Sequence, residues 1–140
     1  MTSVGTQRSD GGFLVGFGLL SQLAVLAGGT GSVYLMLMAG RRNNSSLLMA
    51  LFTIWVLAPF VVLGLASLGS KSWLALTRTT LYGVMLVVSV TSVIIYAGVA
   101  FGPPRPQGAT AFVLVPLSSW LLMAVAIPIA ALTARRNARR

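Results

Sequence analysis

The chain has 140 residues, of which 56% are hydrophobic and only 8% are charged, and its mean hydropathy is +0.91. Soluble proteins carry about 25% charged residues, so this chain has too little polar surface to cover a soluble globule. Its apolar side chains must face lipid or other protein chains. The composition therefore predicts an all-α integral membrane protein and excludes a soluble fold.

The residues that the chain lacks restrict its chemistry. It contains neither Cys nor His, which removes thiolate nucleophiles and the usual zinc ligands. Asp10 is its one acidic residue, whereas a carboxylate pair for acid–base catalysis or a divalent-cation site needs a second one. We therefore expect a protein without enzymatic activity, without a cofactor and without a bound metal ion.

Four apolar stretches are long enough to cross a membrane. They cover about residues 13–39, 47–68, 81–101 and 111–134, and none contains Asp, Glu, Lys or Arg. About 20 helical residues cross about 30 Å of hydrocarbon, so each stretch predicts one transmembrane helix. Short connections make successive helices antiparallel. The prediction is one domain over residues 1–140, an antiparallel four-helix membrane bundle with a basic tail at 135–140.

The first stretch is longer than one crossing needs and contains the segment Gly28-Gly29-Thr30-Gly31. Each glycine weakens a helix by roughly 1 kcal/mol relative to alanine, so we expect a continuous but bent helix. The polar residues before it, which end in Ser9-Asp10-Gly11-Gly12, are expected to form a mobile tail.

The connections contain polar and helix-breaking residues. The first, residues 41–46, offers Asn and Ser side chains that cap the N-terminus of the following helix. The second, residues 70–80, includes Trp73 and is typical of a turn at the membrane interface. The third, residues 102–108, contains three prolines and predicts a stiff, non-helical turn.

The positive charges predict the orientation. Antiparallel helices bring the N-terminus, the second connection and the C-terminus to one side, which then holds seven of the ten basic residues: Arg8, Lys71, Arg78, Arg135, Arg136, Arg139 and Arg140. The other side holds Arg41, Arg42 and Arg105. The positive-inside rule places both termini in the cytoplasm, and we expect the membrane to be a bacterial inner membrane.

The same basic residues predict the polar partner of the protein. They flank apolar runs instead of forming a basic groove with aromatic side chains, so nucleic acid is not expected to bind. We expect Lys71, Arg78 and the four C-terminal arginines to contact anionic lipid headgroups at the cytoplasmic face.

Gln22 is the strongest polar side chain within the four stretches. An unsatisfied polar group in hydrocarbon costs several kcal/mol, so Gln22 is predicted to face a neighbouring helix. One candidate acceptor is the carbonyl of Ala124, which Pro128 leaves without its helical N–H donor. Tyr82 is the alternative partner.

Small, hydroxyl-bearing and indole side chains recur at one depth, about nine residues from the non-cytoplasmic end of each stretch. They are Thr30, Ser32, Thr53, Trp55, Ser92, Ser118, Ser119 and Trp120. The first interpretation is a polar layer that lets the helices approach closely and form interhelical hydrogen bonds. The alternative is a cavity between Trp55 and Trp120 that binds an isoprenoid, a quinone or a lipid headgroup.

The third stretch has the clearest periodic face. Its 3,4 spacing places Tyr82, Met85, Ser89, Ser92 and Tyr96 on one side of a helix. The remaining faces are mostly Val, Leu and Ile, which suit contact with lipid. The stripe predicts a packing face in preference to a pore lining, which would need more hydroxyl groups.

These patterns predict a non-catalytic, multi-pass membrane protein. The main hypothesis is an accessory or structural subunit, or a small homo-oligomer, whose partner is another membrane protein or further copies of the chain. A small passive pore or holin-like membrane-permeabilising protein is one alternative, because its size, uncharged spans and basic tail fit. A lipid- or quinone-binding protein is the other.

Overall fold

The structure of the chain, a computed structural model, describes residues 3–103 and 108–140, with side chains from residue 11 onward. Within these ranges it forms four α-helices and one 3-10 turn: α1 (Ser3–Ala39), α2 (Ser46–Gly69), η1 (Ser70–Ser72), α3 (Ala75–Phe101) and α4 (Gly108–Ala138). All four α-helices are long and apolar enough to cross a membrane. The protein is therefore an all-α, four-helix bundle of the multi-pass membrane class.

The helices extend beyond the predicted apolar stretches. Helix α1 runs unbroken from Ser3 through the glycine-rich segment, so the continuous helix is confirmed and the tail predicted before Phe13 is wrong for residues 3–12. An existing helix gains one hydrogen bond for each added residue, which favours extension into polar sequence. Helix α3 likewise starts before the predicted residue 81, and the hydroxyls of Thr79 and Thr80 donate to carbonyls one turn earlier, at 2.9 and 3.0 Å.

Local side-chain chemistry determines where α2 begins. The backbone of Ser45 is extended, and its hydroxyl accepts a hydrogen bond of 3.4 Å from the N–H of Leu48, as predicted for a serine cap.

Helix α3 ends at Phe101, next to Gly102 and Pro103. The rest of the predicted proline turn, residues 104–107, lies outside the described residues.

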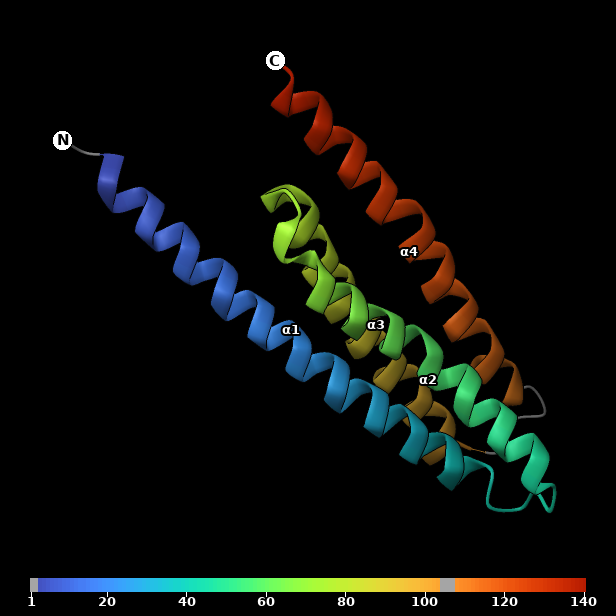
Figure 1. The fold of residues 1–140 in the computed structure, drawn as a ribbon. Coiled ribbons are helices and arrows are strands. Elements are labelled where there is room, and N and C mark those ends of the chain that lie inside the picture. Colours follow the sequence, from blue (N-terminus) through green and yellow to red (C-terminus); the bar gives the residue numbers. More distant parts are fainter. Residues whose placement is uncertain (1–2, 104–107) are drawn as a thin grey trace.

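Successive helices run in opposite directions (Figure 1). The start of α1, the end of α4 and the η1 turn lie at one end of the bundle, called here the terminal end. The end of α1, the start of α2, the end of α3 and the start of α4 lie at the other end, called the connection end. Helices α1 and α4 extend past the η1 turn at the terminal end. The antiparallel arrangement follows from the short connections.

The most extensive helix packing is between α1 and α3, which run parallel to each other. Helix α4 packs on α3 and α2 and makes little contact with α1. Helices α2 and α3 are joined by the short η1 turn, yet they touch less than either touches α1. The most extensive contact in the bundle is therefore between two helices that do not follow each other in the sequence.

The α1–α3 contact is a seam of small and polar residues with matching periodicity on both helices. The predicted α3 stripe is buried in full, which confirms its assignment as a packing face. On α1 the buried residues Gly18, Ser21, Val25, Gly28, Ser32 and Leu35 follow the same 3,4 spacing, and Gly29 and Met36 beside them are also buried. Because this spacing averages 3.5 residues, two parallel helices stay in contact along their length.

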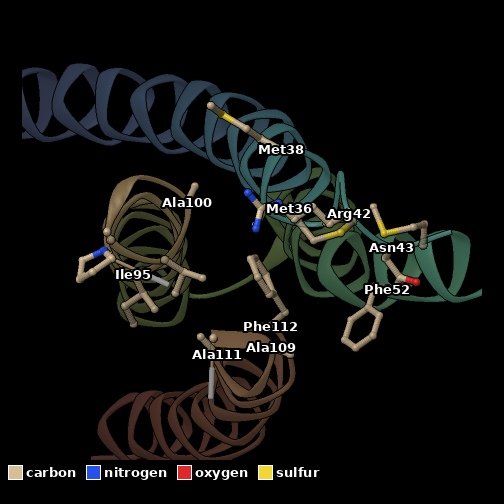
Figure 2. Close-up of a pocket in the computed structure, with 18 of the residues that line it drawn as sticks. Met36, Met38, Arg42, Asn43, Phe52, Ile95, Ala100, Ala109, Ala111 and Phe112 are labelled. Atoms are coloured by element: carbon tan, nitrogen blue, oxygen red, sulfur yellow. The ribbon is translucent and has the colours of Figure 1, made fainter. Parts of the chain in front are cut away.

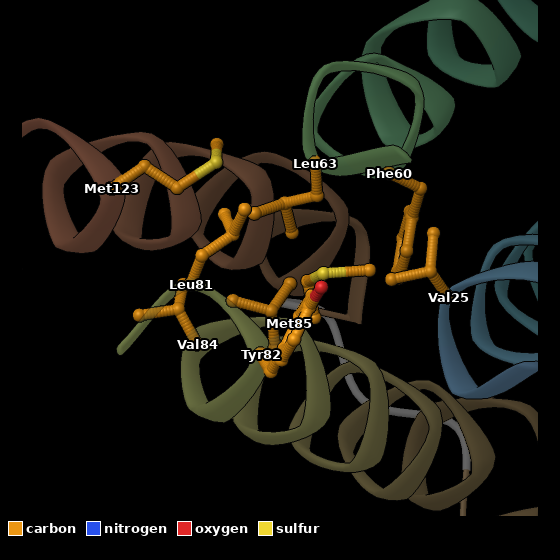
Figure 3. Packing of buried hydrophobic residues seen from close by; sticks show 9 residues of the cluster. Val25, Phe60, Leu63, Leu81, Tyr82, Val84, Met85 and Met123 are labelled. Carbon is orange, nitrogen blue, oxygen red and sulfur yellow. The ribbon is translucent and has the colours of Figure 1, made fainter. Parts of the chain in front are cut away.

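The interior contains two apolar clusters. Figure 3 shows the first, toward the terminal end, where Leu63, Leu81, Met85 and Met123 come together from α2, α3 and α4. The second lies toward the connection end and includes Tyr96, whose ring stacks on Phe112 with a centroid distance of 4.8 Å.

Large apolar side chains also cover the outside of the bundle. Leu47 is 73% exposed, Phe101 69% and Leu121 68%, on three different helices. Exposed apolar surface of this extent is unfavourable in water and favourable in hydrocarbon. The outward faces therefore fit the contact with lipid that the composition predicts.

Candidate functional site

The predicted polar layer is only partly internal. Ser32, Ser92 and Ser119 are buried, with 0%, 1% and 6% of their surface exposed, on α1, α3 and α4 respectively. The hydroxyl oxygens of Ser32 and Ser89 have no hydrogen-bond partner among the described residues. The small size of these serines allows close helix packing, and this part of the layer is the α1–α3 seam with one contribution from α4.

The rest of the layer faces outward or lies at the margin of the bundle. Thr30, Trp55 and Ser118 are exposed, while Thr53 and Trp120 are half-buried. Trp120 packs against the apolar cluster at the terminal end. Neither indole lines the cavity or the groove described below, and the ligand site between the two tryptophans stays a prediction.

The hydroxyl groups of the layer bond mainly within their own helices. Thr53 Oγ1 donates to the Met49 carbonyl and Ser119 Oγ to the Val115 carbonyl, both at 2.8 Å. Ser118 Oγ donates to carbonyls of its own helix in the same way. A Ser or Thr hydroxyl reaches the carbonyl four residues earlier without help from a neighbour. The interhelical bonds expected from these three residues are therefore replaced by bonds inside each helix.

Gln22 faces a neighbouring helix, as predicted, but both predicted partners are wrong. Its Nε2 donates to Ser67 Oγ on α2 at 3.1 Å. The Ala124 carbonyl belongs to α4, with which α1 makes little contact. The hydroxyl of Tyr82 instead accepts from Arg78 Nη2 at 3.2 Å. The hydrogen-bond partner of Gln22 therefore depends on which helix packs beside α1.

A groove of about 400 Å³ runs along the outer surface between α1 and α2. Leucine, valine and phenylalanine side chains form most of its wall, and Gln22 contributes an amide. Gly29 and Gly64 line it from opposite helices. A Cβ atom at Gly29 would contact Phe60 at 3.4 Å, whereas one at Gly64 would meet nothing within 4 Å. The groove is therefore open beside Gly64.

A larger cavity of about 1290 Å³ opens at the connection end, where all four helices contribute to its wall. Figure 2 shows Met36 from α1, Phe52 from α2, Ile95 from α3 and Phe112 from α4 around this space. Arg42 is the one charged residue among the described residues of its lining. In Figure 2 the Arg42 guanidinium group reaches into the space between α1 and Phe112.

The basic residues predicted to contact headgroups lie at the terminal end of the bundle. Those with exposed side chains are Lys71, Arg135, Arg136, Arg139 and Arg140. Arg78 is half-buried and lies over the Tyr82 ring, 5.9 Å from its centroid. The side chain of Arg8 and the whole of Arg105 lie outside the described residues.

Two features were not predicted from the sequence: the buried face of α1 and the cavity at the connection end. The first could have been predicted, because Gly18, Ser21, Gly28 and Ser32 follow the same spacing as the α3 stripe. The cavity leaves no pattern in the sequence, since it arises where four helix ends converge.

The groups that face the groove and the cavity within the described ranges are an amide, a guanidinium, hydroxyls and apolar side chains. Such groups hydrogen-bond to a ligand and pack against lipid or another helix. No family model, curated protein or solved structure matches this chain.

Proposed function

We propose that this protein is a non-catalytic subunit of a larger membrane assembly. In the proposed assembly, a transmembrane helix from another subunit or from a second copy of the chain lies in the α1–α2 groove. The observation that carries the proposal is the amide of Gln22 at the wall of an open, lipid-facing groove.

The hydrogen-bonding capacity of Gln22 favours a protein partner. A glutamine side chain has two N–H donors and a carbonyl oxygen with two acceptor sites. The bond to Ser67 Oγ uses one donor. In hydrocarbon an unsatisfied polar group costs several kcal/mol, and a lipid acyl chain offers no hydrogen bond. A helix with a hydroxyl, an amide or an accessible carbonyl at this depth reduces that cost.

The shape of the groove favours a helix as well. Gly29 and Gly64 remove side-chain bulk from its two sides, and small residues let helix backbones approach closely in a membrane. Leu26, Leu57 and Leu65 provide apolar contact around them. Because lipid competes equally for apolar surface, close packing and hydrogen bonding must supply the affinity between helices.

Replacing Gly64 with leucine is expected to abolish the assembly without unfolding the subunit. The new side chain enters the open groove, because a Cβ at Gly64 meets no atom within 4 Å. Gly83→Leu is the matched control, since Gly83 is also a helical glycine with open space and does not line the groove. We expect native mass measurements in mild detergent to detect the assembly for the wild type and Gly83→Leu only.

Three results of that measurement separate the possibilities. A defined multiple of the chain mass identifies a homo-oligomer, and a fixed additional mass identifies another subunit. A monomeric wild type, or a Gly64→Leu variant that assembles normally, contradicts the proposal. Ion leakage from vesicles that contain the purified wild type would instead support the alternative of a passive pore.

We also propose that both termini lie in the cytoplasm of a bacterial inner membrane. Reporter fusions after Arg42 and after Arg140 are expected in opposite compartments, with the second in the cytoplasm. Changing Arg135, Arg136, Arg139 and Arg140 to glutamine leaves three basic residues on each side, from seven and three. This variant is expected to insert in both orientations. A single, unchanged orientation would contradict the charge argument.

A further inference from the structure

We propose that the cavity at the connection end is a binding site for an anionic phospholipid. Arg42 holds the headgroup phosphate, and the apolar wall of the cavity accommodates the acyl chains. The proposal does not depend on the α1–α2 groove or on the partner that occupies it.

Arg42 has no acidic side chain near it among the described residues. Asp10 is the one acidic side chain in the sequence. Residue 10 is separated from the end of α1 at Ala39 by about 44 Å of helix, at about 1.5 Å per residue. The C-terminal carboxylate is also at the terminal end. Arg42 lines the cavity but is itself exposed, and a guanidinium group without a paired anion among the described residues attracts one from outside the chain.

The geometry of Arg42 and its neighbour suits a phosphate group. A guanidinium presents a planar fork of N–H donors that matches two phosphate oxygens. Asn43 also lines the cavity, and its Oδ1 accepts a hydrogen bond of 3.2 Å from the N–H of Ser45. The Asn43 amide nitrogen is therefore the end of that side chain that can donate to a headgroup.

The remaining wall suits hydrocarbon chains. Met36, Met49, Ile95 and Phe112 line the cavity from different helices, and methionine side chains adapt readily to irregular apolar ligands. The volume of about 1290 Å³ exceeds the roughly 300–1,000 Å³ of ordinary small-molecule pockets. The cavity lies at the helix ends, where headgroups meet hydrocarbon. An amphiphile with one anionic end and a large apolar part matches both regions.

An anionic phospholipid fits better than a zwitterionic one. In a phosphatidylcholine headgroup the lipid's own ammonium group offsets the phosphate charge, whereas phosphatidylglycerol has only the negative charge. Hydrogen bonds to charged groups are stronger than those between neutral groups, so loss of the Arg42 contact should lower the affinity measurably. The lipid headgroup charge is therefore the variable to test.

The test is lipid binding to the full-length protein in neutral detergent, measured by native mass spectrometry with phosphatidylglycerol or phosphatidylcholine. We expect the wild type to bind its first phosphatidylglycerol about tenfold more tightly than phosphatidylcholine. Arg42→Gln should remove this preference. Arg41→Gln is the matched control, because Arg41 is adjacent to Arg42 and is exposed as Arg42 is, but does not line the cavity, and it should retain the preference.

A second variant tests the apolar part of the site with Arg42 intact. Gly98 lines the cavity, and a Cβ there would meet no atom within 4 Å. Gly98→Leu should fill part of the space and weaken the first binding event for both lipids, while circular dichroism shows an intact helical fold. Equal binding of the two lipids by the wild type, or equal effects of Arg41→Gln and Arg42→Gln, would overturn the proposal. Unchanged binding by a folded Gly98→Leu variant would do the same.

Discussion

Replacing Gly28 with leucine is expected to destabilise the bundle by about 3 kcal/mol, at the upper end of the cost of overpacking. A Cβ atom at this position would lie 2.8 Å from Ser89 Cβ and 3.1 Å from Ser89 Cα. The Ser89 Cα belongs to the α3 backbone and cannot move aside alone, so α1 and α3 must separate. This weakens the most extensive helix contact in the protein.

The measurement is unfolding of the purified protein in mixed micelles with increasing dodecyl sulfate, followed by circular dichroism. Gly16→Leu is the control, because it makes the same substitution on the same helix where a Cβ meets nothing within 4 Å. Leucine favours a helix more than glycine by roughly 1 kcal/mol or less, so the control should be unchanged or slightly stabilised. Equal stability of the two variants would show that the α1–α3 seam is not close-packed at Gly28.

Replacing Tyr96 with alanine is expected to cost about 2–3 kcal/mol. The Tyr96 side chain is fully buried, and its ring stacks on Phe112 between α3 and α4. Aromatic-to-alanine changes in water-soluble cores cost about 3–5 kcal/mol. The value here is lower because separated helices expose the ring to lipid instead of water, so lost packing is the main effect.

The same unfolding titration measures this effect, with Tyr34→Ala as the control. Tyr34 is on α1 and 59% exposed, so its removal takes away few contacts within the bundle and should change stability by less than about 0.5 kcal/mol. Because Tyr96 belongs to the cluster next to the cavity, the Tyr96→Ala variant should also bind phosphatidylglycerol more weakly. A loss no larger than that of Tyr34→Ala would contradict the packing around Phe112.

The sequence alone predicted the properties that depend on one helix at a time. The deficit of charge predicted the membrane class, and the length of each apolar stretch predicted four crossings, because hydrocarbon thickness sets the minimum helix length. The 3,4 spacing from Tyr82 to Tyr96 predicted the packing face of α3. The ends of the helices were less predictable, since α1 continues through the polar residues 3–12 by ordinary helix propagation.

The relations between helices were decided by the tertiary structure alone. It pairs Gln22 with Ser67 on α2 instead of with Ala124 or Tyr82, and it turns Thr30 and Trp55 outward while Ser32 is buried. It also forms the cavity around Arg42 from four separate helix ends. In water, apolar residues mark the buried face of a helix. In lipid the buried and exposed faces are both apolar, so only the packed helices reveal which side chains meet.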